Sequence, residues 1–210
     1  NLSTPSQTEA LSASLQRLAA NANLPPLLVA IDQEGGPVTR VSWGADPPSA
    51  MAAGATGREA VAAEVGAAIG EELRALGINL NFAPVLDVNV NPENPVIGIR
   101  SFGDDPSLVS RFGSQFAEGL QRADVLACGK HFPGHGDTVT DSHHQLPVLP
   151  HSRERLDRAE LAPFQRAVGD RVEAILRTPL DFPTFRGSRE LPVPAASGVR
   201  ARTAAVQAYW

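Results

Sequence analysis

The residues best suited to chemistry lie between positions 126 and 150, where four of the five histidines of the chain fall. In that stretch, Asp141, Ser142 and His143 follow one another in a loop rich in glycine and proline. An aspartate two residues from a histidine can accept a hydrogen bond from one ring nitrogen, which leaves the other nitrogen to exchange a proton with a substrate. Asp141 and His143 therefore predict a general acid/base dyad. The alternative is a solvated histidine beside a turn-forming aspartate.

Lys130 and His131 stand just before this loop, one glycine after the apolar run 125–128. In a parallel α/β protein, loops at the carboxyl ends of strands project into the cleft that carries the chemistry. A lysine in this position faces either the mouth of a barrel or a salt bridge, and both keep it near acidic side chains. We therefore expect the active site here. Cys128, inside the apolar run, is expected to be a buried filler rather than a reactive thiol.

Asp32 closes a second apolar run, residues 27–31, and is followed by a glycine pair at positions 35 and 36. No Lys-Ser/Thr follows, so a phosphate-binding loop is a poor match. A carboxylate at a strand end suits the hydroxyl groups of a sugar, and Arg40 could add a donor. The alternatives are a turn-forming acid for Asp32 and a surface cation for Arg40. Arg100 follows a loop rich in proline and asparagine, where a solvated arginine is the simpler interpretation.

A metal site is the alternative chemistry for the histidine-rich stretch, because it holds several residues of metal-ligand type: His131, His135, Asp137, His143 and His144. Pro133 and Gly134 separate the first two histidines, so these cannot share one face of a helix as they do in zinc-binding helices. We therefore expect no metal and no cofactor.

The elements that must position these residues alternate between helix and strand. Helical patterns cover residues 4–22, 57–77, 107–123 and 152–171, and strand patterns cover 27–31, 78–88, 125–128 and 173–178. About four βα units with short links predict a parallel α/β fold, and polar residues after each strand favour a barrel over a doubly wound sheet. A complete (β/α)8 barrel takes about 250 residues. We expect one domain over residues 1–210, an incomplete barrel truncated at both ends, with no convincing strand in 189–210.

Composition argues against several classes of function. The net charge of −5 arises from 18 basic and 23 acidic residues without a basic stripe, so a nucleic-acid partner is not expected. There is no run of 18 apolar residues and no charged-then-apolar leader, which argues against a membrane span and a signal peptide. A single cysteine excludes an internal disulfide. We expect a cytoplasmic protein, and the sequence leaves its oligomeric state open.

Four motifs, in this order, resemble those of glycoside hydrolase family 3. They read IDQEGGPVTR at 31–40, NFAPVLDV at 81–88, RSFG at 100–103, and KHFPGHGD at 130–137 followed by Asp141, Ser142 and His143. The resemblance covers about residues 5–180. The Asp-Ser-His sequence narrows it to the β-N-acetylglucosaminidase branch, in which a loop histidine paired with an aspartate is the acid/base.

The resemblance implies a (β/α)8 TIM-type barrel and retaining hydrolysis of a terminal β-linked N-acetylglucosamine, of the peptidoglycan-recycling kind. His143 matches the acid/base and Asp141 its partner. In the implied reaction an aspartate attacks the anomeric carbon, and the histidine first protonates the leaving oxygen and then activates water. The implied partner is a carbohydrate, with no cofactor. The residues that hold the sugar are matched by Asp32, Arg40, Arg100, Lys130 and His131.

One part of the family pattern is missing. The family carries its nucleophilic aspartate on a later strand, and nothing in residues 189–210 resembles that strand, while Asp181 is in the wrong place to replace it. Three explanations stay open: a fragment of a longer enzyme, a barrel that binds sugar without hydrolysing it, or attack by another carboxylate. A β-glucosidase of the same family is a further alternative, against which the Asp-Ser-His sequence argues.

Overall fold

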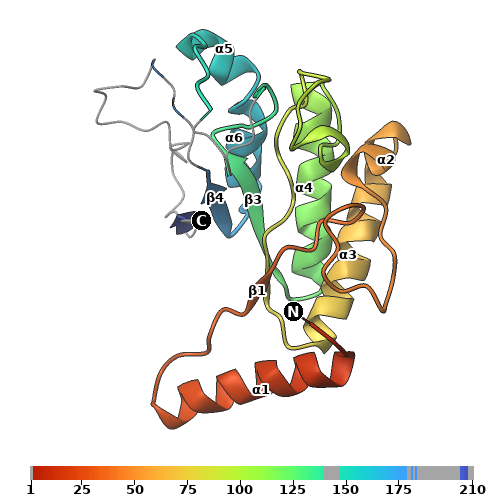
Figure 1. Cartoon of the computed structure of the whole chain (residues 1–210), viewed down its shortest axis with the longest axis vertical. Helices are drawn as coiled ribbons and strands as arrows, with labels where there is room; N and C mark the ends of the chain where they lie inside the picture. The colour runs from red at the N-terminus through yellow and green to blue at the C-terminus, as the bar shows by residue number, and fades with distance from the viewer. Residues whose placement is uncertain (1, 140–146, 179–180, 182, 184–203, 208–210) are drawn as a thin grey trace.

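A sheet of five parallel strands forms the centre of the computed structural model, which describes residues 2–139, 147–178, 181 and 183, and the backbone of 204–207 (Figure 1). The strands follow one another across the sheet in chain order. A doubly wound sheet reverses its strand order, so this arrangement is that of successive units of a (β/α) barrel, as the sequence predicts. The strands are β1 (Ala30–Ile31), β2 (Leu80–Asn81), β3 (Leu126–Phe132), β4 (Ala174–Arg177) and β5 (Ala204–Gln207).

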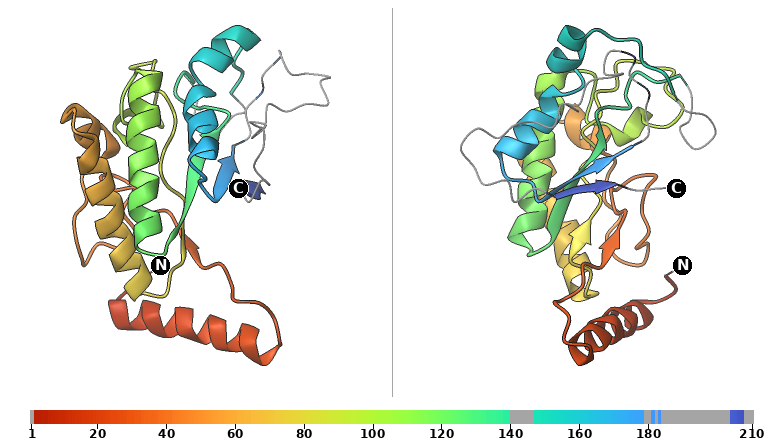
Figure 2. Two further views of the ribbon diagram at one scale, coloured as in Figure 1. Left: turned by 180° about the vertical axis from the view of Figure 1, so that it is seen from behind. Right: turned by 90° about the vertical axis from the view of Figure 1, so that its left-hand side faces the viewer.

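Three helices, α3, α4 and α6, stand in a row beside the strands, and α1 lies across the end of the molecule from which β3 starts (Figure 2). None of the helices in the described part of the chain combines the length and the apolar character that a membrane crossing requires. The helices are α1 (Pro5–Asn21), α2 (Ala50–Ala55), α3 (Glu59–Ala75), the 3-10 helix η1 (Gly98–Arg100), α4 (Pro106–Arg122), α5 (Arg153–Arg158) and α6 (Ala162–Gly169).

Helix α4 shows how the core is built. Asp105 caps its start by accepting hydrogen bonds from the backbone N–H groups of the second and third residues after it, at 3.2 and 3.1 Å. The apolar residues recur at helical spacing and are buried in the main core, which stabilises the helix against the sheet and α3. Glycine at position 119 lets α3 and α4 pack closely, because a Cβ there would lie 2.3 Å from the carbonyl oxygen of Ala63.

The expected helices are confirmed to within a few residues, with two differences. Residues 152–171 form two helices rather than one, because Pro163 lies in the first turn of α6 and its ring cannot continue a preceding helix. Helix α2 is not predicted by the sequence patterns. It has no acidic residue in its first turn, and only the Ser49 hydroxyl, which accepts from the N–H of Ala52 at 3.3 Å, marks its start.

The strands differ more. The expected strands 27–31 and 78–88 contain only two ladder residues each, and the second has one further bridge, from Val85 to Lys130. The expectation of no strand in residues 189–210 is wrong, because all four residues of β5 pair in parallel with β4. The sequence of β5 has low intrinsic strand preference, so backbone pairing with β4 decides its structure.

Candidate active site

The loop after β1 presents Asp32 and Glu34, and the side chains of Gln33 and Asn81 hold its shape. The amide of Asn81, in β2, accepts from the N–H of Gln33 at 3.0 Å and donates to its carbonyl oxygen at 2.8 Å. Gln33 in turn donates to the carbonyl oxygen of Val41 at 3.1 Å. Because all these groups are buried and bonded, the two carboxylates on either side of Gln33 have fixed positions.

Glu34 binds two cations that come from different elements. Its carboxylate accepts two hydrogen bonds from the Arg100 guanidinium, at 2.9 and 2.8 Å, and lies 2.6 Å from the Lys130 ammonium. Lys130 Nζ is also 2.5 Å from Asp32 Oδ1. Burial opposes ionisation of Glu34, but the bonds and charges of Arg100 and Lys130 outweigh it and hold the pKa of Glu34 below its usual 4.5. Glu34 is therefore a buried anion that anchors both cations.

Asp87 is a buried anion that anchors His131, as Glu34 anchors Arg100 and Lys130. This fully buried carboxylate accepts from the backbone N–H of His131 at 3.2 Å and from that of His135 at 2.6 Å, and it lies 2.6 Å from His131 Nδ1. Burial opposes its ionisation, but His131 and the hydrogen bonds outweigh it, so the pKa of Asp87 is lowered from 3.8. Burial and the charges of Lys130 and Arg100 lower the pKa of His131. The charge and the hydrogen bond of Asp87 act in the opposite direction but do not outweigh them. Neutral His131 thus donates from Nδ1 to Asp87.

Arg100, which is bound to Glu34, also contacts His131. Its Nη2 atom lies 3.3 Å from His131 Nε2, the ring nitrogen that is free to accept a hydrogen bond. The loop that carries Arg100 is fastened by Asn94, whose amide accepts from two following N–H groups and donates to the carbonyl oxygen of His135 at 2.8 Å. All these residues lie at the carboxyl ends of β1, β2 and β3, where barrel enzymes place their sites.

The side chains of the site differ in exposure, which separates those that can contact a ligand from those that hold them in place. The side chains of Asp32, Arg100 and His131 are 25%, 15% and 15% exposed, whereas those of Lys130 and Glu34 are almost fully buried. The accessible groups are thus a carboxylate acceptor, a guanidinium donor and an imidazole. This combination suits a ligand with several neighbouring hydroxyl groups.

The structure brings together four of the seven residues predicted for the site: Asp32, Arg100, Lys130 and His131. The Arg40 side chain is exposed and makes no hydrogen bond to the described residues, and only its backbone N–H is used, donating to Gln33 Oε1 at 2.7 Å. Asp141 and His143 lie outside the described residues.

Cys128 is fully buried, and burial raises the pKa of its thiol to about 12, which confirms an inert filler.

Glu34 and Asp87 are the residues that sequence reasoning missed. Both stand in motifs that the sequence displays, and Asp87 follows an apolar run, 82–86, interrupted only by proline. A carboxylate in such a run is buried and therefore needs partners. The nearby cations and histidines could have suggested its role.

Acid is expected to destabilise the fold in two steps. The unfolded chain binds protons more readily than the folded one wherever the folded pKa is lowered, so stability rises with pH in that range. His131 contributes stability above its ordinary pKa of 6.5 that is lost as the pH falls below it, and Glu34 and Asp87 add a second loss below 4.5 and 3.8. Urea unfolding between about pH 7.5 and 3.5 measures both steps. The loss of stability below pH 6.5 should be smaller in His131→Gln. A free energy of unfolding that does not change with pH over this range would contradict the assignment.

Comparison with known proteins agrees with the motifs and the fold. The family model "Glycosyl hydrolase family 3 N terminal domain" matches residues 1–203. Beta-hexosaminidase A of Pseudoalteromonas piscicida is 37% identical over 99% of this chain and 36% of its own length. A glycoside hydrolase family 3 beta-N-acetylglucosaminidase from Paenibacillus sp. str. FPU-7 superposes with a TM-score of 0.86 and 54% identity, over 88% of this chain and 35% of that chain.

A third relative has been solved with a sugar derivative. NagZ from Neisseria gonorrhoeae, in complex with N-trifluoroacetyl-D-glucosamine, superposes with a TM-score of 0.80 and 34% identity, over 88% of this chain and 55% of that chain. The chain spans about a third to a half of the length of the relatives it matches. Since the family model covers nearly all of these residues, the chain belongs to glycosyl hydrolase family 3 and carries the N-terminal domain of that family.

Proposed function

We propose that the protein is a retaining glycoside hydrolase that removes a terminal β-linked N-acetylglucosamine, with cell-wall (peptidoglycan) fragments as its natural source. The observation that carries the proposal is the partly exposed group of Asp32, Arg100 and His131 at the carboxyl ends of the strands. Two similar proteins support the choice of sugar: one is called a beta-N-acetylglucosaminidase, and another binds N-trifluoroacetyl-D-glucosamine.

Each accessible group has a role in holding the sugar. Asp32, oriented by Lys130, accepts hydrogen bonds from hydroxyl groups, and Arg100 donates to hydroxyl oxygens from a guanidinium that Glu34 keeps in place. His131 offers its Nε2 atom beside Arg100. These bonds hold the anomeric carbon in position for attack. Such positioning is the main way in which binding increases the rate of the reaction. Arg40, which the resemblance places in the same subsite, would add a further donor from its exposed side chain.

The chemical steps need two further groups. We assign the acid/base role to His143, paired with Asp141, so that one imidazole protonates the leaving oxygen and then activates water. Glu34 and Asp87 are not placed to attack an anomeric carbon, because both are buried beneath the groups they bind. We assign the attack to a carboxylate outside the four motifs, as the family resemblance implies.

Hydrolysis of an aryl N-acetyl-β-glucosaminide and of the matching aryl β-glucoside by the intact protein tests this function. We expect turnover of the first substrate only and a fall of about 10²–10⁴-fold in His143→Ala, the usual size of a general acid/base contribution. NMR of the first-formed product should show the β-anomer. Equal turnover of the glucoside would indicate a β-glucosidase instead. Binding of N-acetylglucosamine without turnover by the folded protein would indicate a sugar-binding barrel.

A further inference from the structure

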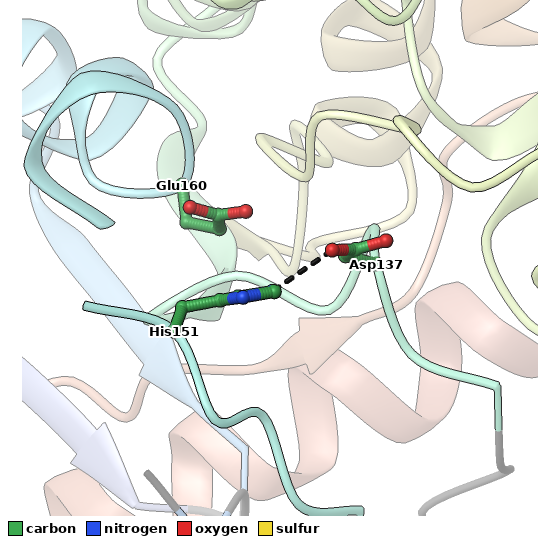
Figure 3. Close-up of side chains that lie close together, drawn as sticks. All are labelled: Asp137, His151 and Glu160. Carbon is green, nitrogen blue, oxygen red and sulfur yellow. Dashed lines mark ion pairs between the residues drawn. The ribbon is translucent and has the colours of Figure 1, made fainter. Parts of the chain in front are cut away.

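Three side chains outside the sugar-binding group converge near the end of β3: Asp137, His151 and Glu160 (Figure 3). Asp137 belongs to the loop that follows β3, His151 precedes α5, and Glu160 lies between α5 and α6. One nitrogen or oxygen of each lies within 4.8 Å of the others, and His151 Nε2 is 2.8 Å from Asp137 Oδ2. The chain therefore collects one imidazole and two carboxylates from three separate segments.

Glu160 is the member whose surroundings point to a ligand. Its side chain is 2% exposed, and its Oε2 atom is buried without a hydrogen-bond partner among the described residues. The stem of Glu160 cannot easily retreat, because it packs against the loop at Gly134, where a Cβ would lie 2.8 Å from Glu160 Cβ. An unpaired buried carboxylate oxygen is costly, and a bound cation would satisfy it.

Arg155 neutralises only part of the negative charge of Asp137 and Glu160. Its Nη2 atom lies 3.0 Å from Glu160 Oε1 and 3.2 Å from Asp137 Oδ2, and its side chain is 37% exposed. One guanidinium faces two carboxylates, so these three groups together carry one uncompensated formal negative charge. Because Arg155 reaches in from the partly exposed side, it can withdraw into solvent when another cation enters.

We propose that Asp137, His151 and Glu160 bind one divalent transition-metal ion, with Zn²⁺ the best match. A mixed nitrogen and oxygen ligand set suits zinc, whereas Mg²⁺ and Ca²⁺ prefer oxygen alone. Zinc bonds of about 2.1 Å place tetrahedral ligands about 3.4 Å apart. To bind the ion, the His151 and Asp137 ligand atoms, now 2.8 Å apart, would separate slightly, and any ligand pair nearer the 4.8 Å limit would draw together. Water would be the fourth ligand. Asp137 and His151 lie on either side of residues 140–146, so the ion would join the two described segments that flank them.

Titration of the intact protein with Zn²⁺, followed by calorimetry, tests the proposal. We expect one ion per chain, and an affinity at least about tenfold weaker in Glu160→Gln and in His151→Gln, because each removes a ligand. Glu154→Gln is the matched control: the same chemical change, close by on α5, at a side chain that is 79% exposed and paired with Arg158. This control should bind zinc as the wild type does. Co²⁺ in place of Zn²⁺ should give a tetrahedral visible spectrum that is lost in His151→Gln.

Arg155→Met separates a metal site from a cluster of ion pairs. If the cluster binds metal, removing the competing guanidinium tightens zinc binding by about tenfold or more. The zinc-bound variant then also unfolds at a higher temperature than the metal-free one. If the cluster is only an ion-pair network, the variant loses stability that zinc does not restore. Absence of zinc binding at micromolar concentration, or binding that both ligand variants retain, would overturn the proposal, the latter by placing the ion on other histidines.

Discussion

Glu34→Gln is expected to lower the free energy of unfolding by about 3 kcal/mol and to reduce kcat/KM by about 10²-fold. The carboxylate is buried and accepts from Arg100 twice and from Lys130 once. The amide would leave Arg100 without this anion and Lys130 with Asp32 alone, and it would turn a donor toward one of the two cations. Breaking a buried ion pair from one side is costly because the remaining charge stays desolvated. Arg100 would then lose the geometry with which it faces the sugar.

Urea unfolding and steady-state kinetics on the N-acetyl substrate measure the two effects of Glu34→Gln. The matched control is Glu118→Gln, which breaks a half-exposed pair with Arg122 on the surface of α4. Such a pair contributes less than about 1 kcal/mol, and activity should not change. Full activity in a stable Glu34→Gln variant would show that Arg100 and Lys130 do not depend on this anchor.

Asp87→Asn is expected to destabilise the protein by a similar amount, about 3 kcal/mol, and to change the tautomer of His131. The carboxylate accepts from two backbone N–H groups and from His131 Nδ1. An asparagine has one acceptor oxygen for these donors, and its NH₂ group would face another donor. His131 would then lose the bond that holds the proton on Nδ1 and frees Nε2. We expect kcat/KM to fall by about 10²-fold, as for other groups that orient a site.

Nitrogen-15 NMR of the His131 ring distinguishes this effect from simple loss of stability. The wild type should show a neutral ring with the proton on Nδ1, and Asp87→Asn should show a shift toward the Nε2 tautomer. Asp170→Asn, which removes the partner of Arg166 on the surface of α6, is the control and should leave both the ring signals and the activity unchanged. An unaltered His131 tautomer in a folded Asp87→Asn variant would contradict the role assigned to Asp87.

The sequence by itself determined the type of fold and most of the candidate residues. Helix α4 is encoded locally by its cap, its proline and its apolar period, and such signals survive in any context. The polar residues that follow each apolar run marked the strand ends, and the family motifs named Asp32, Arg100, Lys130 and His131. The strands expected at 27–31 and 78–88 are longer than β1 and β2, which have two ladder residues each, because ladder length depends on the neighbouring strand.

The tertiary structure decided which of these residues work together. Arg100 meets Glu34 across 66 positions of sequence, and Lys130 meets Asp32 across 98. It also paired β5 with β4 and brought Asp137, His151 and Glu160 into one cluster. Local patterns encode how a segment folds and which face is buried. The partner of a buried charge depends on the path of the whole chain, because a hydrogen bond requires contact within about 3 Å.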